Sequence, residues 1–547
     1  MALNKLQIRA KIMPILAELK NDAKLSLDIF MQKTEELREI EDKKTFFDIL
    51  CKEMSKKNDD KYTDILRAMT LEFIPADMIE QSAMNIIQHS SEPDMLKYQL
   101  IQILKTMGKN IDYQEFYEYL DDATSIINYD TEKLLEHAVV NPETQIDFLD
   151  FLAALQNSDK SLLIDSLSSD YTGDNLANIL APVLYSDYPE NILLQTTEIL
   201  GETKSSLAID ALEFLHEVTD SDEIRTACKK SLNMLKLSGA TKQKADNFYK
   251  RIMSESVPFK CYTGVPDGHY NQGFIFSRKR KDGSLMMFSL VVSKLYGIVD
   301  SFGFFNISEA EFERIALRFS KDEIRFSVSP EYCKMLLENA LALTKSRKET
   351  MRYEFICWAM LMADISPMEQ TEENFVMEKI EPIQLNKKIV NILYTTNYID
   401  KWFFTVKDNE NFKNLIDDFI AQKNLTFEYV EEKIKDSFDE IWNENTLKLL
   451  HNNIMTTCYL FVYIDFKDYA KILYSILFNE QLKKEMLEEI IKKSVYEYFF
   501  SIKQMNKEFK FPTNIFRKKE EQKKEIDIRT VDKIIASIEE KWVVEEI

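Results

Sequence analysis

The sequence predicts a mainly α-helical protein with one small α+β region inserted between two helical regions. The 547 residues contain only 10 glycines and 12 prolines, which is too few turn residues for a mostly β protein. Through most of the chain, apolar side chains recur every three or four residues, the period of an amphipathic helix. Six of the glycines lie between Gly264 and Gly303, where short apolar runs replace that period. The fold class follows from this contrast.

Residues 1–240 are predicted as successive amphipathic helices that contain an internal repeat. Four segments share a polar turn, an acidic residue and then a helix, and they begin at Ser90, Val140, Ser186 and Thr219. The first three carry a proline at the same place, Pro93, Pro142 and Pro189, just inside the predicted helix start. A missing amide hydrogen costs nothing there, because the first turn of a helix leaves its amides unpaired.

The stretch "DYPENILLQTTEILGETKSSLAIDALEFLHEVTDSDEIRTACKKSLNML", Asp187–Leu235, resembles HEAT repeats of the bacterial type. It reads as helix, short turn, helix, and then a polar turn into the next pair. The segment starts are spaced by roughly 33 to 50 residues, near the period of that class, although the likeness is looser back towards Ser90. The resemblance implies an α-solenoid that binds proteins. An irregular helical bundle is the alternative.

Residues 255–330 are predicted as a small α+β domain. Asp282-Gly283 stands between two apolar runs, a pattern typical of a β-hairpin. The run 285–292 is apolar on both alternating faces, which predicts a central strand covered on both sides. Ser308 and Glu311 have the spacing of a capping box at a helix start. Ser329 is predicted to cap the next helix, with Pro330 at its first position. Strands are expected at 259–263, 273–279, 285–293, 296–305 and 323–329.

Residues 331–547 are predicted as a C-terminal helical region without a confident repeat spacing. A charged linker or exposed helix is expected at 516–530. The predicted helices span 351–363, 411–422, 427–442, 446–464, 482–502 and 531–544.

Charge and cysteine usage favour a cytoplasmic protein with neither a nucleic-acid nor a membrane partner. The net charge of −22 repels nucleic acid and anionic membranes at long range. The six cysteines form no CxxC pair, a distribution typical of reduced, buried thiols. The first 20 residues lack the apolar core of a signal peptide, and no stretch of about 20 uncharged apolar residues occurs.

The glycine-containing stretch Gly264–Gly273 has features of three kinds of site. Asp267 and His269 are a carboxylate and an imidazole at metal-ligand spacing, but a turn aspartate before glycine is common for backbone reasons alone. Gly268 and Gly273 have the glycine spacing of a phosphate-binding loop, but Phe274 follows where such a loop needs lysine. Neither a metal nor a cofactor is therefore expected. An enzyme or small-ligand site in this domain would draw on Cys261, Asp267, His269 and Asp300. For Cys261, a buried strand cysteine is the simpler interpretation.

The basic run Arg278, Lys279, Arg280 and Lys281 lies beside the predicted hairpin turn. Alternate strand residues face opposite sides, so two charges are expected on each face of a solvated tip that discourages edge-to-edge pairing. The alternative is a cationic hairpin that binds an acidic partner or single-stranded RNA, for which Tyr270, Phe274 and Phe276 could supply stacking.

The sequence therefore predicts a non-catalytic scaffold or adaptor that binds proteins through its helical repeats. The partner cannot be named from the residues. Two alternatives stay open: an enzyme or small-ligand binder with its site in residues 255–330, and RNA binding through the basic hairpin.

Overall fold

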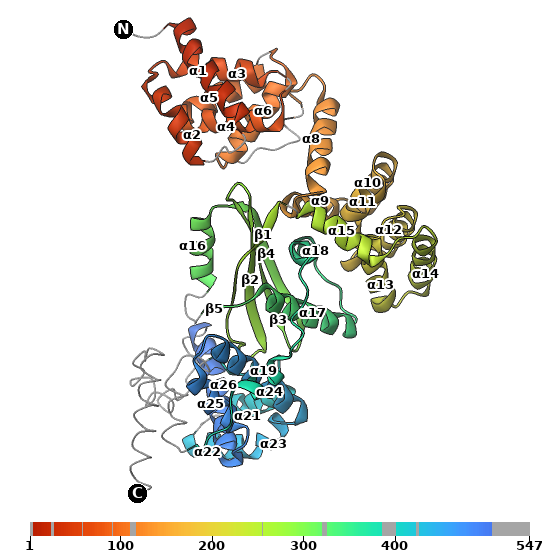
Figure 1. The fold of residues 1–547 in the computed structure, drawn as a ribbon, viewed down its shortest axis with the longest axis vertical. Helices are drawn as coiled ribbons and strands as arrows, with labels where there is room; N and C mark the ends of the chain where they lie inside the picture. The colour runs from red at the N-terminus through yellow and green to blue at the C-terminus, as the bar shows by residue number, and fades with distance from the viewer. Residues whose placement is uncertain are drawn as a thin grey trace. The chain divides into compact units, whose positions relative to one another are not determined.

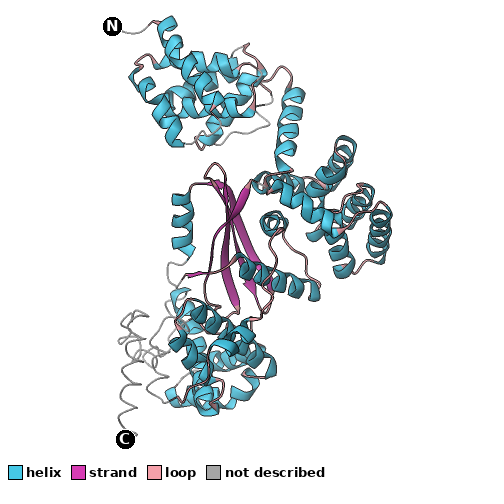
Figure 2. Ribbon diagram, viewed as in Figure 1, coloured by secondary structure: helices cyan, strands magenta, loops and turns pink. Residues whose placement is uncertain are grey.

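A computed structural model describes residues 4–22, 27–56, 58–89, 91–109, 116, 118–253, 255–319, 325–385, 401–422 and 426–505. These residues are mainly helical and include one five-stranded antiparallel sheet, as the sequence predicts (Figure 2). The chain divides into two compact units, Met1–His137 and Ala138–Ile547. The division falls inside the stretch 1–240, which the sequence predicts as one repeat region.

Among its described residues, the first unit has only helices as regular secondary structure. The helix α1 packs against α3 and α4, and α5 packs against α6. Their apolar faces enclose one core, in which Ile12, Leu16, Leu50 and Leu66 are fully buried. The elements are α1 (Lys5–Asn21), α2 (Leu27–Thr34), η1 (Glu35–Glu39), α3 (Lys43–Met54), α4 (Asp60–Phe73), α5 (Ala76–His89), α6 (Asp94–Thr106) and α8 (Ala123–Ala138).

The second unit begins with a stack of helices. The helices α10, α12 and α14 pack side by side in that order, and α13 packs against α14 and η2 (Figure 1). The elements are α9 (Pro142–Ala154), α10 (Asn157–Asp170), α11 (Gly173–Leu180), η2 (Ala181–Tyr185), α12 (Glu190–Glu202), α13 (Ala208–Val218), α14 (Asp222–Leu237) and α15 (Lys242–Ile252).

Hydrogen bonds join neighbouring helices of this stack at a regular sequence interval. Ser161 Oγ donates to Gln195 Oε1 at 2.8 Å, and Ser231 Oγ donates to the Thr197 carbonyl at 2.9 Å. The residues in each of these bonds are 34 positions apart. The bonds from Ser205 to Asp174 and from Ser221 to Glu190 each span 31 positions. The stack is therefore built from units of similar length.

The alignment of the repeats differs from the one read from the sequence. The helix beside α12 is α10, whereas α9, which starts at Pro142, packs on α18 and β4. Proline marks the start of α9 because Asn141 caps it and Pro142 needs no amide partner there. This signal is local, so it does not report which helix lies beside which. Membership of the HEAT class stays a prediction.

The sheet has the strand order β4-β3-β2-β1-β5. One face carries the main core of the unit, formed with α17, α18 and the C-terminal helices, and α16 covers the other face (Figure 1). The elements are β1 (Ser256–Thr263), β2 (Asn271–Arg280), β3 (Leu285–Ser293), β4 (Gly297–Ile307), α16 (Glu309–Phe319), β5 (Phe326–Ser327), α17 (Pro330–Ser346), α18 (Tyr353–Ala359) and η3 (Met360–Met362).

The local signals in this region are confirmed. Gly283 closes the β2–β3 hairpin at φ +92°, a left-handed conformation that glycine adopts without strain. The predicted central strand is β3, which pairs with both β2 and β4. The Ser308 amide donates to Glu311, and the Glu311 amide donates back to Ser308 Oγ. Ser329 caps α17 with Pro330 in its first turn. Of the last expected strand, 323–329, the first two residues lie outside the described residues, and β5 has two residues, Phe326–Ser327.

The C-terminal helices pack below the sheet as drawn in Figure 1 and share its main core. The sequence predicted all of them except α19 and α25. The elements predicted at 516–530 and 531–544 lie outside the described residues. The elements are α19 (Glu372–Lys379), α21 (Glu410–Ala421), α22 (Phe427–Asp436), α23 (Phe438–Ile441), α24 (Glu444–Tyr463), α25 (Lys467–Ile476) and α26 (Glu480–Met505). No described helix has the length and apolar character needed to cross a membrane.

Candidate ligand-binding site

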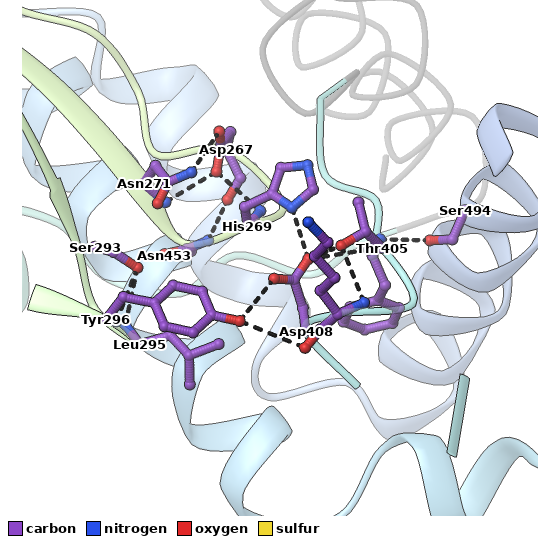
Figure 3. Close-up of polar contacts among 12 residues, drawn as sticks. Asp267, His269, Asn271, Ser293, Leu295, Tyr296, Thr405, Asp408, Asn453 and Ser494 are labelled. Atoms are coloured by element: carbon purple, nitrogen blue, oxygen red, sulfur yellow. Dashed lines mark hydrogen bonds and ion pairs between the residues drawn. The ribbon is translucent and has the colours of Figure 1, made fainter. Parts of the chain in front are cut away.

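The loop between β1 and β2 is organised by Asp267. Its carboxylate accepts from the amides of His269 at 2.8 Å and Asn271 at 2.9 Å. Its carbonyl accepts from Asn453 Nδ2, on α24, at 2.9 Å (Figure 3). Burial raises the pKa of Asp267, although these amides partly oppose that effect. This is the backbone role that the turn position of Asp267 predicts.

His269 joins the same loop to the segment before α21. Its Nδ1 lies 2.6 Å from Asp408 Oδ2, and Asp408 also accepts from the Thr405 amide at 3.0 Å and from Tyr296 OH at 3.1 Å (Figure 3). The bond to Asp408 raises the pKa of His269. Burial disfavours the charged Asp408, but the bonds from His269 and Thr405 outweigh it and hold the pKa of Asp408 low. The histidine thus holds two segments together.

The loop is also fixed by close backbone contact. The Gly268 amide donates to the Lys401 carbonyl at 2.8 Å, and Trp402 Nε1 donates to the Pro266 carbonyl at 2.9 Å. A Cβ atom on Gly268 would lie 2.1 Å from the Phe403 nitrogen, so no larger residue fits without movement of the backbone. The loop therefore docks on residues 401–403.

The four pocket candidates from the sequence do not form one site. Asp267 and His269 share the loop, but Cys261 is buried in the core of β1, and Cys333 is its neighbour. Asp300 lies on the edge strand β4 and is exposed. The expectation that Cys261, Asp267, His269 and Asp300 line a single pocket is wrong, because the sheet directs these side chains to different places.

A cavity of about 510 Å³ lies beside the same strands, and Tyr270, the residue after His269, is part of its lining. Its walls come from the ends of β2 and β3, from α17, from residues 368–373 and from α24. One part of the lining is apolar and includes Met335, Leu336, Leu343 and Met455, while the rest is polar and includes Gln272, Lys294, Asn339, Glu369, Glu372 and Glu373. This volume and mixed lining are typical of sites for small molecules.

Lys294 is the cationic group of the cavity. It follows β3 directly, and its main-chain amide donates to the Tyr270 carbonyl at 2.9 Å. Its Nζ donates to the Asn452 carbonyl at 2.8 Å and to Thr456 Oγ1 at 2.5 Å. Its side chain is 22% exposed. Burial lowers the pKa of Lys294, and Glu372 opposes this only in part.

A chain of hydrogen bonds continues from Lys294 through the cavity wall. Thr456 Oγ1 donates to Glu372, whose Oε2 lies 4.0 Å from Lys294 Nζ. Tyr332 OH donates to Glu372 Oε1 at 2.6 Å, and Gln272 Nε2 donates to Tyr332 OH at 3.3 Å. Burial raises the pKa of Tyr332 far above its usual range, so the phenol stays a donor. The network therefore links an amine and a carboxylate of the cavity lining to the hydroxyl groups of Thr456 and Tyr332.

Sequence reasoning missed this site. Lys294 is visible in the sequence as a charge that interrupts the apolar run 285–305, and that interruption is the one local signal. Glu372 lies in a helix that the sequence did not predict, and Thr456 is 162 positions from Lys294. Residues so far apart come together only through the packing of α19 on α24 and of α24 against the sheet.

The basic run does not form the expected solvated tip. Arg278 is 1% exposed, and its guanidinium makes two bonds to Asp364, at 2.6 Å and 3.0 Å. Lys279 pairs with Glu309 at 3.0 Å. Arg280 stacks over Phe305 at 4.1 Å, which leaves Lys281 as the most exposed member of the run. Arg278 is buried because it faces η3. It donates to the Leu361 carbonyl of η3 and pairs with Asp364, two residues after η3.

Among the described residues, no group of three or more histidine, cysteine, aspartate or glutamate side chains is arranged to hold a metal ion. No protein-family model, curated protein or solved structure matches the chain.

Proposed function

We propose that the second unit binds a small polar molecule in the cavity beside Lys294. One observation carries the proposal: a partly exposed ammonium and a carboxylate lie 4.0 Å apart on the wall of a 510 Å³ cavity. Removing charged groups from water is costly, and apolar side chains could fill the same space. Buried ionisable groups gathered in a cavity are typical of functional sites.

The lining indicates the chemical class of this molecule. Glu369 and Glu373 are exposed at the cavity, and Glu372 lies deeper, so three carboxylates face one ammonium. This balance repels anions and favours neutral or cationic molecules. The methionine and leucine side chains of α17 and α24 offer an apolar wall to the carbon skeleton.

A thermal-shift screen of uncharged hydroxylated and amino compounds tests the proposal. A bound compound raises the melting temperature of the wild-type protein by mass action. Asn339→Trp places a large ring on an exposed position of the lining and should abolish the shift. Ala342→Trp is the matched control, because Ala342 is exposed on the same helix but lies off the cavity. Shifts of equal size in both variants, or none in the wild type, would refute binding in this cavity.

A second function, protein binding through the helical stack, is favoured by two exposed apolar side chains. Leu162 on α10 is 67% exposed and Phe151 on α9 is 48% exposed. The stack would act as a scaffold, as its resemblance to HEAT repeats implies. Affinity purification of the wild-type chain from the native cell should recover a partner protein, and purification of the Leu162→Glu variant should not. Leu317→Glu, at a residue that is 60% exposed on α16, is the control and should retain it.

RNA binding is not favoured by this geometry. The basic run is largely occupied by Asp364, Glu309 and Phe305. Phe274 and Phe276 are fully buried and cannot stack on bases.

A further inference from the structure

We infer that Lys294 is a nucleophilic amine that forms an imine with a small uncharged aldehyde or ketone in the cavity. The inference rests on the proposed function, since it names the chemistry by which the cavity holds its ligand. It draws on the hydrogen bonds around Nζ, on the acid groups beside it and on the charge of the lining.

The surroundings of Lys294 Nζ accommodate the neutral amine that is in equilibrium with the ammonium. Two acceptors lie within hydrogen-bond distance, the Asn452 carbonyl at 2.8 Å and Thr456 Oγ1 at 2.5 Å. The Glu372 carboxylate, at 4.0 Å, is beyond that distance. A neutral amine has two N–H groups and one lone pair, so the two acceptors use both donors and leave the lone pair for a carbonyl carbon. Burial of Nζ also lowers the cost of losing the third proton.

The neighbouring groups can move the protons that imine formation requires. The amine attacks the carbonyl carbon, a C–N bond forms, and the oxygen becomes a hydroxyl group. That hydroxyl group then leaves as water while the C=N bond forms, so the two amine protons depart in the water. Glu372 can exchange these protons with Nζ through Thr456, whose hydroxyl group is hydrogen-bonded to both, and it also accepts a hydrogen bond from Tyr332. No oxidant or reductant takes part.

The charge of the lining selects among carbonyl compounds. The carboxylates of Glu369, Glu372 and Glu373 disfavour keto acids and phosphorylated aldehydes. A neutral hydroxyaldehyde keeps the reactive carbonyl, carries no negative charge and can hydrogen-bond to the polar wall. Glyceraldehyde is therefore a suitable probe and pyruvate a suitable contrast.

Reductive trapping of the full-length protein tests the inference. The protein is incubated with glyceraldehyde and cyanoborohydride near neutral pH, and the labelled lysines are located by peptide mass spectrometry. We expect Lys294 to be labelled faster than Lys281, an exposed lysine, because burial lowers the pKa of Lys294 and so raises the fraction of neutral amine. Pyruvate should label Lys294 less than glyceraldehyde does.

Variants separate this inference from the proposed function. Asn339→Trp should protect Lys294 from labelling and Ala342→Trp should not, while Lys294→Arg keeps the charge and removes the site. Labelling of Lys294 no faster than that of Lys281, combined with thermal shifts that Asn339→Trp abolishes, would overturn the imine and leave ligand binding intact. Absence of both would overturn both. Equal labelling of Lys294 in Asn339→Trp and the wild type would also overturn the inference, because the amine would then react outside the cavity.

Discussion

His269 Nδ1 lies 2.6 Å from Asp408 Oδ2, and this pair joins the loop after β1 to the segment that precedes α21. The two residues are 139 positions apart in the chain. Tyr296, from the turn after β3, donates to the same carboxylate. Asp408 is therefore one point at which the sheet and the segment before the C-terminal helix α21 are held together.

The stability of the second unit should fall as the pH rises past the titration of His269. The folded pKa of His269 is raised by Asp408, so its protonated form stabilises the fold below about pH 6.5, its ordinary value. That contribution is lost as the pH rises through the higher folded pKa. Denaturant unfolding followed by tryptophan fluorescence between pH 6 and 9 should show a loss of about 1–3 kcal/mol in the wild type.

The variant His269→Gln should lack this pH dependence. His451→Gln is the control, because His451 is exposed and its contact with Glu373, at 3.3 Å, is worth little at the surface. An unchanged pH dependence in His269→Gln would show that another group is responsible.

Gly268→Ala should destabilise the second unit by about 2 kcal/mol or more, because the new methyl group would overlap the backbone of Phe403. Gly283→Ala is a matched comparison. No atom lies within 4 Å of a Cβ there, and only the left-handed backbone at φ +92° is strained, at a cost of about 1 kcal/mol. Denaturant unfolding measures both. A smaller loss for Gly268→Ala than for Gly283→Ala would contradict the docking of the loop.

Arg278→Ala should cost about 3–5 kcal/mol, because it leaves Asp364 without its partner in a largely buried place. Lys281→Ala should change the free energy of unfolding by less than about 0.5 kcal/mol, since Lys281 is 74% exposed. The double variant Arg278→Met/Asp364→Leu should recover much of the loss, because no charge is then left unpaired. If the double variant lost as much free energy of unfolding as Arg278→Ala does, the stabilisation would come from packing and not from the ion pair.

Gly201→Ala should destabilise the helical stack, although the same change stabilises most helices by about 1 kcal/mol. A Cβ on Gly201, in α12, would lie 2.9 Å from the Ser231 Cα atom of α14. The variant should lower the midpoint of denaturant unfolding, whereas Glu202→Ala, at an exposed neighbouring position, should not. If the double variant Gly201→Ala/Ser231→Gly is more stable than the sum of the two single changes predicts, the overlap lies at this contact.

Local signals predicted much of the fold, while the candidate site depended on distant contacts. Asp282-Gly283 and the pair Ser308 and Glu311 act within a few residues, so the sequence shows them directly. The partner of Arg278 is 86 positions away, and the acceptor of Lys294 is 162 positions away. The pattern of polar and apolar residues cannot predict such pairs, because a charged residue in an apolar run does not indicate which distant residue it contacts.

The distance between Lys294 and Thr456 also sets an order of events during protein synthesis. The strands β1–β4 and α17 leave the ribosome well before α24, and Lys294 lacks its hydroxyl acceptor until 162 further residues have been added. In the nascent sheet, the lysine at the end of the central strand β3 therefore has only water as a partner. Completion of α24 is the step that gives this amine its partners and closes the cavity wall.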